Sequence, residues 1–150
     1  MRRELPMMLV RTAVALIFLL EGSLQFLAPP EPGAGDFAAI GLPLASVLAP
    51  AAGGVEIAAG AAVLVNLYAG DASLALMAVV LTALLTKIPI LLGRPMGFLT
   101  LAKVSRYGWL GFFHEARLDL AMLLCLAAIL VDSGLQVGRR RRPWYQSKGL

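Results

Sequence analysis

Residues 72–92, ASLALMAVVLTALLTKIPILL, decide the fold, because this run of 21 residues holds a single charged side chain, Lys87. An α-helix rises about 1.5 Å per residue, so a run of this length crosses the hydrocarbon core of a bilayer, which is about 30 Å thick. The apolar residues are continuous and do not alternate with polar ones, which excludes a strand of a membrane β-barrel. The stretch therefore predicts a membrane-spanning helix.

Three more segments have the same character, and the composition of the chain agrees with them. The 150 residues are 59% hydrophobic and 15% charged, whereas a soluble domain carries about 25% charged residues. Prolines at 29, 30 and 32 end the first segment, and residues 98–111 read as a short interfacial helix. We expect an all-α fold, a polytopic four-helix membrane bundle in a single domain over residues 1–150, with helices at about 5–28, 44–67, 72–92 and 112–137.

The positions of Lys and Arg in the flanking segments predict the orientation. The loop of residues 29–43 has none, and its apolar residues place it on the membrane surface, whereas eight lie toward the ends: Arg2, Arg3, Arg11, Arg139, Arg140, Arg141, Arg142 and Lys148. Both termini are therefore expected in the cytoplasm, with residues 138–150 as a basic tail. Three basic residues between 94 and 106 oppose this orientation, but the contrast between the ends and the first loop is larger.

The basic tail and the single cysteine limit the function further. Arg139, Arg140, Arg141 and Arg142 follow directly on an apolar run, so they are expected to contact lipid headgroups and not nucleic acid. Cys125 has no second cysteine to pair with, which excludes an intramolecular disulfide and a CxxC motif. The first segment is too long for a cleaved signal peptide and is expected to stay as an anchor in a bacterial-type cytoplasmic (inner) membrane.

Ionisable side chains inside the predicted helices are the candidate functional residues. A charged group at membrane depth costs about 2.5–3.5 kcal/mol, so it usually faces a partner or a cavity. The predicted orientation places seven such groups in the middle or outer half of the bilayer: Glu21, Glu56, Lys87, His114, Glu115, Arg117 and Asp119.

Helical spacing groups four of these residues into pairs. His114 and Arg117 are three residues apart, and Glu115 and Asp119 are four apart, so each pair shares one face of the helix. Two stacked acids repel each other unless a cation lies between them. Lys87 is at the depth to supply that cation.

Arg117 is in turn expected to pair with Glu21 or Glu56. Two readings stay open: the charges form interhelical ion pairs that fix the packing, or they line a pocket that binds a small molecule or relays protons. One histidine, His114, cannot hold a metal alone, so no metal site is expected. Small residues at 53, 54, 58 and 61 are expected to allow close helix approach.

Two sequence strings resemble the DoxX family of small four-helix membrane proteins. The first is Glu21-Gly22-Ser23-Leu24-Gln25-Phe26, followed by a proline-rich loop and then by Glu56 and Gly60; the second is His114-Glu115-Ala116-Arg117-Leu118-Asp119-Leu120. The resemblance covers nearly the whole chain, although Gln25 stands where the family usually has lysine. It implies two kinds of role, since some relatives are associated with membrane redox assemblies, including quinone-linked thiosulfate oxidation, and others resemble accessory or chaperone-like membrane proteins. By similarity, the candidate site is Glu21, Glu56, Glu115, Arg117 and Asp119.

The leading hypothesis is a subunit of a membrane redox assembly that binds a quinone or a similar amphipathic molecule. Glu56 or Glu115 would relay protons, and Arg117 or Lys87 would bind the headgroup. No intrinsic cofactor and no catalytic residue can be assigned, so redox centres would belong to partner subunits. The alternatives are a non-enzymatic scaffold or assembly factor and a proton-coupled carrier. Expected partners are membrane lipids and either other membrane or redox subunits or further copies of the chain.

Overall fold

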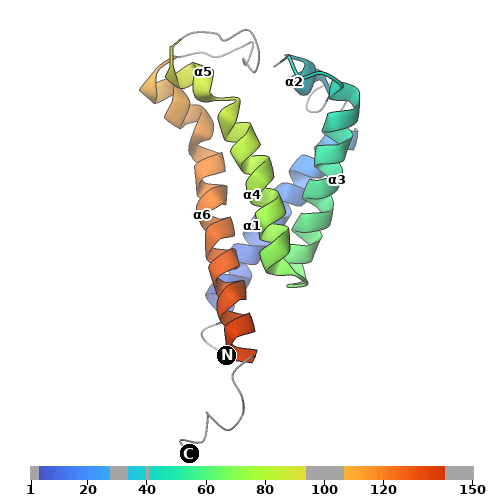
Figure 1. The fold of residues 1–150 in the computed structure, drawn as a ribbon, viewed down its shortest axis with the longest axis vertical. Helices are drawn as coiled ribbons and strands as arrows, with labels where there is room; N and C mark the ends of the chain where they lie inside the picture. The colour runs from blue at the N-terminus through green and yellow to red at the C-terminus, as the bar shows by residue number, and fades with distance from the viewer. Residues whose placement is uncertain (1–3, 28–33, 40, 94–106, 141–150) are drawn as a thin grey trace, which may run out of the picture.

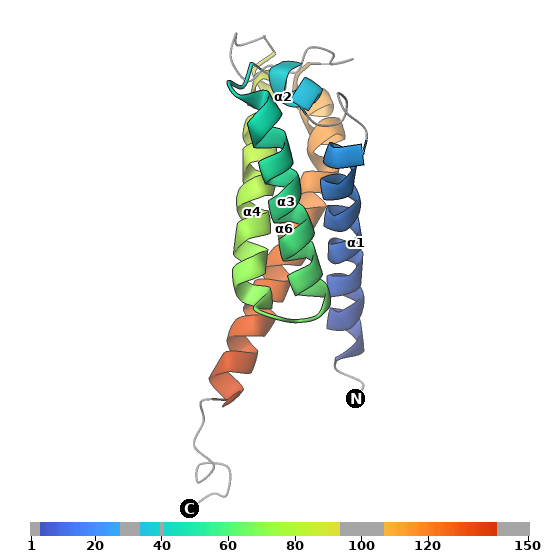
Figure 2. The same cartoon turned by 90° about the vertical axis from the view of Figure 1, so that its right-hand side faces the viewer.

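The computed structural model describes residues 4–27, 34–39, 41–93 and 107–140, and every regular element in these ranges is helical. Four long helices lie side by side, and two short ones lie at one end of the molecule (Figures 1 and 2). The elements are α1 (Leu5–Leu27), α2 (Ala34–Ala39), α3 (Ala45–Leu64), α4 (Ala69–Leu85), α5 (Ile88–Leu91) and α6 (Trp109–Arg140). The prediction of an all-α fold is confirmed.

Consecutive long helices run in opposite directions. α1 packs on α3, α3 on α4, and α4 on α6, while α6 returns to contact α1. The start of α1 and the end of α6 therefore lie at the same end of the molecule, and α2 and α5 lie at the other (Figure 1). Residues 29–43, expected as a surface loop, contain α2, which packs against the start of α3.

The predicted third helix, residues 72–92, differs most from the structure. The helix begins earlier, at Ala69, and α4 ends at Leu85, before the short α5. Pro89 explains the break, because its ring collides with the carbonyl group four residues earlier, which is that of Leu85. Lys87 lies in the turn between the two helices.

The other two turns also have local causes. Leu44, which precedes α3, and Asn66 and Tyr68, between α3 and α4, have positive φ angles of 57°, 58° and 49°. These residues reverse the chain where the helices end, so α3 is shorter than the predicted 44–67. α6 exceeds the predicted 112–137 by three residues at each end. The interfacial helix expected at 98–111 lies largely outside the described residues.

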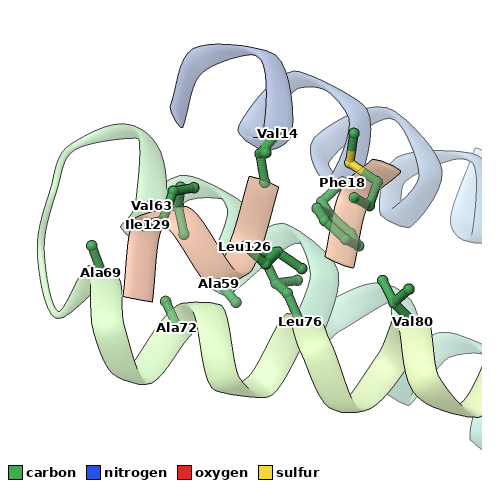
Figure 3. Packing of buried hydrophobic residues seen from close by; sticks show 11 residues of the cluster. Val14, Phe18, Ala59, Val63, Ala69, Ala72, Leu76, Val80, Leu126 and Ile129 are labelled. Atoms are coloured by element: carbon green, nitrogen blue, oxygen red, sulfur yellow. The ribbon is translucent and has the colours of Figure 1, made fainter. Parts of the chain in front are cut away.

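A core of small and branched apolar side chains fills the centre of the molecule (Figure 3). All four long helices contribute to it, and Leu76, Leu126 and Ile129 are fully buried. The members of this cluster are Val14, Phe18, Ala59, Val63, Ala69, Ala72, Leu76, Val80, Met122, Leu126 and Ile129.

The outside of the helices is also apolar, which is the opposite of a soluble protein. Leu20, Leu124 and Val131 are 64%, 74% and 63% exposed. By length and composition, α1, α3 and the segment Ala69–Leu91 can each cross a membrane. α6 is not among these candidates; it carries Glu115, Arg117, Asp119 and Asp132 along its length. Four membrane crossings and cytoplasmic termini therefore stay predictions.

Candidate functional site

A cavity of about 310 Å³ lies between α1, α3, α4 and α6, next to the apolar core. Five of the seven predicted site residues line it: Glu21, Glu56, Lys87, Glu115 and Asp119. The remaining wall is apolar and consists of Ile17, Phe18, Val79, Val80, Ala83, Leu118 and Met122. The sequence prediction that these charged groups lie at a similar depth on neighbouring helices agrees with this arrangement.

Lys87 and Asp119 form an ion pair across this cavity, between the end of α4 and α6. The two side chains are only 16% and 18% exposed, so solvent screens their attraction weakly. Pro89 cannot lie in the interior of a continuous helix, so α4 ends before it. Lys87 lies in the resulting turn, at the cavity. Of the two stacked acids for which a cation was predicted, Lys87 pairs with Asp119.

Glu56 is the most buried acid of the cavity, at 6% exposure, and α1 provides its hydrogen-bond donor. The Nε2 atom of Gln25 donates to a Glu56 carboxylate oxygen over 3.2 Å. The sequence analysis noted Gln25 only as a replacement for the lysine that is usual in the family. Gln25 is four residues after Glu21 and therefore shares its helix face, a signal that places both side chains next to α3.

A close crossing of α1 and α3 holds Glu56 and Gln25 together. A Cβ atom added to Gly22 would lie 2.7 Å from the carbonyl oxygen of Gly53, and one added to Gly53 would lie 2.9 Å from that of Gly22. Only glycine permits this approach. Of the small residues expected at helix contacts, Gly53 is confirmed, whereas Gly54, Ala58 and Ala61 are exposed and face away from α1.

His114 and Arg117 do not reach the cavity, so the expected pairing of Arg117 with Glu21 or Glu56 is wrong. The cause is helical geometry: at about 100° per residue, Arg117 points nearly opposite to Asp119, which follows it by two positions and lines the cavity. Arg117 is exposed along α6, in a second hollow that also includes His114. The Nδ1 atom of His114 lies 3.2 Å from an oxygen of Glu115.

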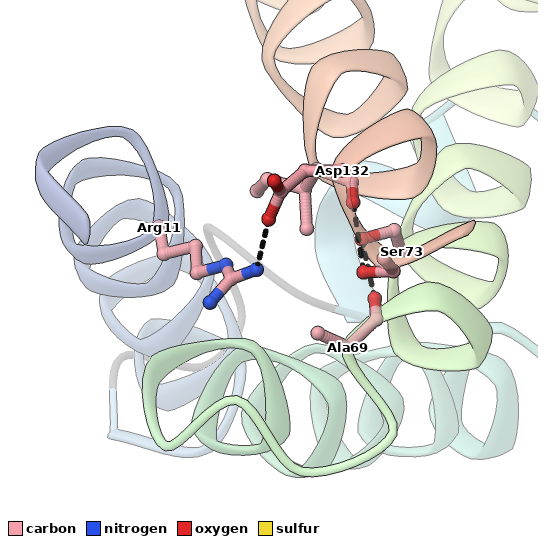
Figure 4. A network of polar contacts seen from close by, with 6 residues as sticks. Arg11, Ala69, Ser73 and Asp132 are labelled. Carbon is pink, nitrogen blue, oxygen red and sulfur yellow. Dashed lines mark hydrogen bonds and ion pairs between the residues drawn. The ribbon is translucent and has the colours of Figure 1, made fainter. Parts of the chain in front are cut away.

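A second group of polar contacts joins α1 to α6, beside the start of α4 (Figure 4). Arg11 of α1 is 8% exposed, and its guanidinium group lies 2.6 Å from the carboxylate of Asp132 on α6. Nearby, the hydroxyl group of Ser73 donates to the carbonyl oxygen of Ala69 over 2.6 Å. Sequence reasoning counted Arg11 among the flanking basic residues and missed this pair. The sequence did contain a signal for this pair. Arg11 and Asp132 have opposite charges within apolar helices, and they lie at similar distances from the end of the molecule that the start of α1 and the end of α6 share.

The charges around the cavity do not balance. Four carboxyl groups face one ammonium group there, and within the described part of the chain no group of three or more His, Cys, Asp and Glu residues is placed to hold a metal ion. Outside the Lys87–Asp119 pair, the carboxyl groups of the cavity offer acceptor oxygens to hydrogen-bonding ligands. The cavity can therefore accept hydrogen bonds and donate them from Lys87.

Comparison with known proteins gives two matches. The DoxX family model matches residues 7–87. An uncharacterized membrane protein of Mycobacterium tuberculosis, Rv3486, is 39% identical over 122 residues, which cover 81% of this chain and 71% of the relative. No solved structure matches the chain. The matched family segment contains Glu21, Glu56 and Lys87, and it ends before α6.

Proposed function

Because the chain belongs to the DoxX family of membrane proteins, we propose that it binds a quinone or a similar amphipathic molecule as a subunit of a membrane redox assembly. The observation that carries this proposal is a cavity that combines an apolar lining with five ionisable side chains, Glu21, Glu56, Lys87, Glu115 and Asp119. Its volume, about 310 Å³, lies at the lower end of the range for small-molecule sites, which suits a headgroup more than a whole prenylated molecule.

The two kinds of lining residue suit the two parts of a quinone headgroup. Phe18, Leu118 and Met122 offer apolar and aromatic contact to the ring. Lys87 carries N–H groups that can donate to a ring carbonyl oxygen, and its ion pair with Asp119 holds it at the cavity. A tail of isoprenoid type would extend from the cavity into the lipid, as the apolar outer surface of the helices permits.

The carboxyl groups provide the proton part of the chemistry. Reduction of a quinone to a quinol takes two electrons and two protons. Glu56 and Glu115 face the cavity and can pass protons to the carbonyl oxygens, while a partner subunit with a redox centre supplies the electrons. Gln25 holds Glu56 in position through its hydrogen bond.

We place the protein in a bacterial-type cytoplasmic membrane with all four long helices crossing it. The start of α1 and the end of α6 lie at the same end of the molecule, and most basic residues of the sequence flank these two helix ends, which supports cytoplasmic termini. In this orientation the acidic cavity lies nearer the outer surface and the Arg11–Asp132 pair nearer the inner one. Arg139–Arg142, whose side chains lie outside the described residues, are proposed to contact anionic headgroups on the cytoplasmic side.

A scaffold or assembly factor is the second candidate function, and the two ion pairs favour it. Lys87–Asp119 and Arg11–Asp132 each join α6 to another helix, as expected of charges that only specify packing. Under this alternative, exchange of Lys87 and Asp119 would preserve function. Under the quinone proposal the exchange moves the ammonium group to α6 and weakens ligand binding.

Quinone titration of the full-length protein in nanodiscs tests the proposal. Isothermal titration with a short-chain naphthoquinone should show saturable binding, which Glu56→Gln weakens and Ala83→Leu abolishes by filling the cavity. Loss of one charge-assisted hydrogen bond corresponds to about tenfold weaker binding. Glu4→Gln, which changes an exposed acid at the start of α1, serves as the control. Equal binding by all four proteins would refute the proposal.

A further inference from the structure

We propose that a groove along α6 binds the headgroup of a phospholipid that carries both a phosphate and a primary ammonium group, as phosphatidylethanolamine does. The groove has a volume of about 550 Å³ and is lined by His114, Glu115, Arg117, Leu118 and Ala121. Its cation, Arg117, takes no part in the acidic cavity. Glu115 lines both sites, but the inference rests on Arg117 and does not depend on quinone binding.

Arg117 needs a partner that the described part of the chain does not provide. Its side chain is exposed and forms no ion pair with any described residue. An unpaired guanidinium group on a membrane-facing helix is costly, and a phosphate group matches its forked donors in two parallel hydrogen bonds. His114, on the same face one turn earlier, has its Nε2 atom left for the same phosphate, since Nδ1 faces Glu115.

The Arg117 side chain of the groove is within reach of the membrane interface. α6 begins at Trp109, which is 71% exposed, beside the exposed Tyr107, and such aromatic residues mark the membrane interface. Arg117 follows Trp109 by eight residues, or about 12 Å along the helix. Helical side chains point toward the N-terminus of their helix, so the guanidinium group of Arg117 reaches back toward the interface.

Glu115 selects the type of headgroup. Its side chain is 37% exposed and lies in the same groove, where it repels a headgroup with negative charge alone. A primary ammonium group can donate to this carboxylate while the neighbouring phosphate accepts from Arg117. A choline headgroup has no N–H to donate. Leu118 and Ala121 continue the groove in the direction of an acyl chain, which completes the fit to a phospholipid.

Native mass spectrometry of the full-length protein tests this assignment. The protein is equilibrated with equal amounts of phosphatidylethanolamine, phosphatidylglycerol and phosphatidylcholine in mild detergent, and the bound lipids are counted. We expect phosphatidylethanolamine to be enriched. Arg117→Gln should lower the retention of phosphatidylethanolamine about tenfold, as expected for the loss of a charge-assisted hydrogen bond. Asp71→Asn, in the first turn of α4 at the opposite end of the molecule, is the matched control and should change nothing.

Glu115→Gln gives the sharper test, because its effect is a ratio measured within one sample. Removal of the carboxylate should lower the ratio of bound phosphatidylethanolamine to phosphatidylglycerol about tenfold, while Arg117 still holds the phosphate. Overturning results are equal retention of all three lipids, a preference of the unchanged protein for phosphatidylglycerol, or an Arg117→Gln protein with unchanged lipids. None of these readouts involves quinone, so failure here is distinguishable from failure of the proposed function.

Discussion

Replacement of Gly22 by alanine tests the close crossing of α1 and α3, which places Gln25 beside Glu56. The new Cβ atom would lie 2.7 Å from the carbonyl oxygen of Gly53, 2.9 Å from Cγ1 of Ile57 and 3.0 Å from Cβ of Glu56. The first of these contacts is with backbone, which cannot rotate out of the way. The two helices must therefore separate by several tenths of an ångström, and the hydrogen bond from Gln25 to Glu56 lengthens.

The expected magnitude follows from two opposing effects. Overpacking at a tight contact costs about 1–3 kcal/mol. Alanine in a helix gains up to about 1 kcal/mol over glycine. Because the contact is with backbone, we expect Gly22→Ala to lower the free energy of unfolding by about 1–2 kcal/mol. The matched control is Gly54→Ala, where an added Cβ meets nothing within 4 Å and only the gain applies.

The assay is reversible unfolding in mixed micelles, with sodium dodecyl sulfate as the denaturant and circular dichroism as the signal. Gly22→Ala should unfold at a lower detergent fraction than the unchanged protein, and Gly54→Ala at an equal or higher one. If the two alanine variants unfold together at or above the midpoint of the unchanged protein, then α1 and α3 do not cross at Gly22 and Gly53, and the position assigned to Glu56 is wrong.

The same assay checks three more substitutions. Lys87→Met should destabilise the protein by about 3–5 kcal/mol because Asp119 is left without its cation. The double variant with Asp119→Leu should regain most of this loss. A Lys87→Met protein as stable as the unchanged protein would contradict the ion pair. Leu76→Ala, at a fully buried position, should cost about 2–5 kcal/mol, whereas Leu74→Ala, at a 52% exposed position, should cost far less; equal losses would disprove the packing of α4. Gln25→Leu should cost about 1.5–3 kcal/mol, the contribution of a hydrogen bond to a charged acceptor, and no loss would refute its contact with Glu56.

The long apolar runs made the helices predictable, and local turn chemistry set their ends. A long, predominantly apolar stretch such as residues 5–28 predicts a helix in a membrane, and α1 follows it closely. The break at Lys87 was harder to predict, because a proline near the end of a membrane helix is often tolerated, and the carbonyl group that it displaces lies four residues earlier. The residue at which α4 ends also depends on how its C-terminal end packs, and the sequence alone does not show that packing.

The candidate site was predictable in composition but not in its contacts. Depth along the helices brought Glu21, Glu56 and Lys87 to one level, and spacing placed Glu115 on one face with Asp119. The rotation of each helix about its own axis decides which of these groups meet. Packing sets that rotation, mainly through the glycine contact between α1 and α3, and a single sequence does not show which small residues form it.

Arg117 and Arg11 show the two ways in which this gap misled the sequence reading. Arg117 was expected to pair with an acid at its own depth, yet its position between Glu115 and Asp119 turns it to the opposite side of α6. Arg11 was counted as a flanking residue because it lies near the start of the chain, yet it is buried against Asp132. Both errors concern direction around a helix and not position along it.

Native mass spectrometry of the protein extracted gently from its own membrane tests the proposed function most directly. The proposal predicts that a quinone and a stoichiometric redox subunit stay bound, and that the Ala83→Leu protein, with its cavity filled, loses the quinone but keeps the subunit. A homo-oligomer that carries phospholipid and no quinone would contradict the proposal and leave Lys87–Asp119 and Arg11–Asp132 as purely structural ion pairs.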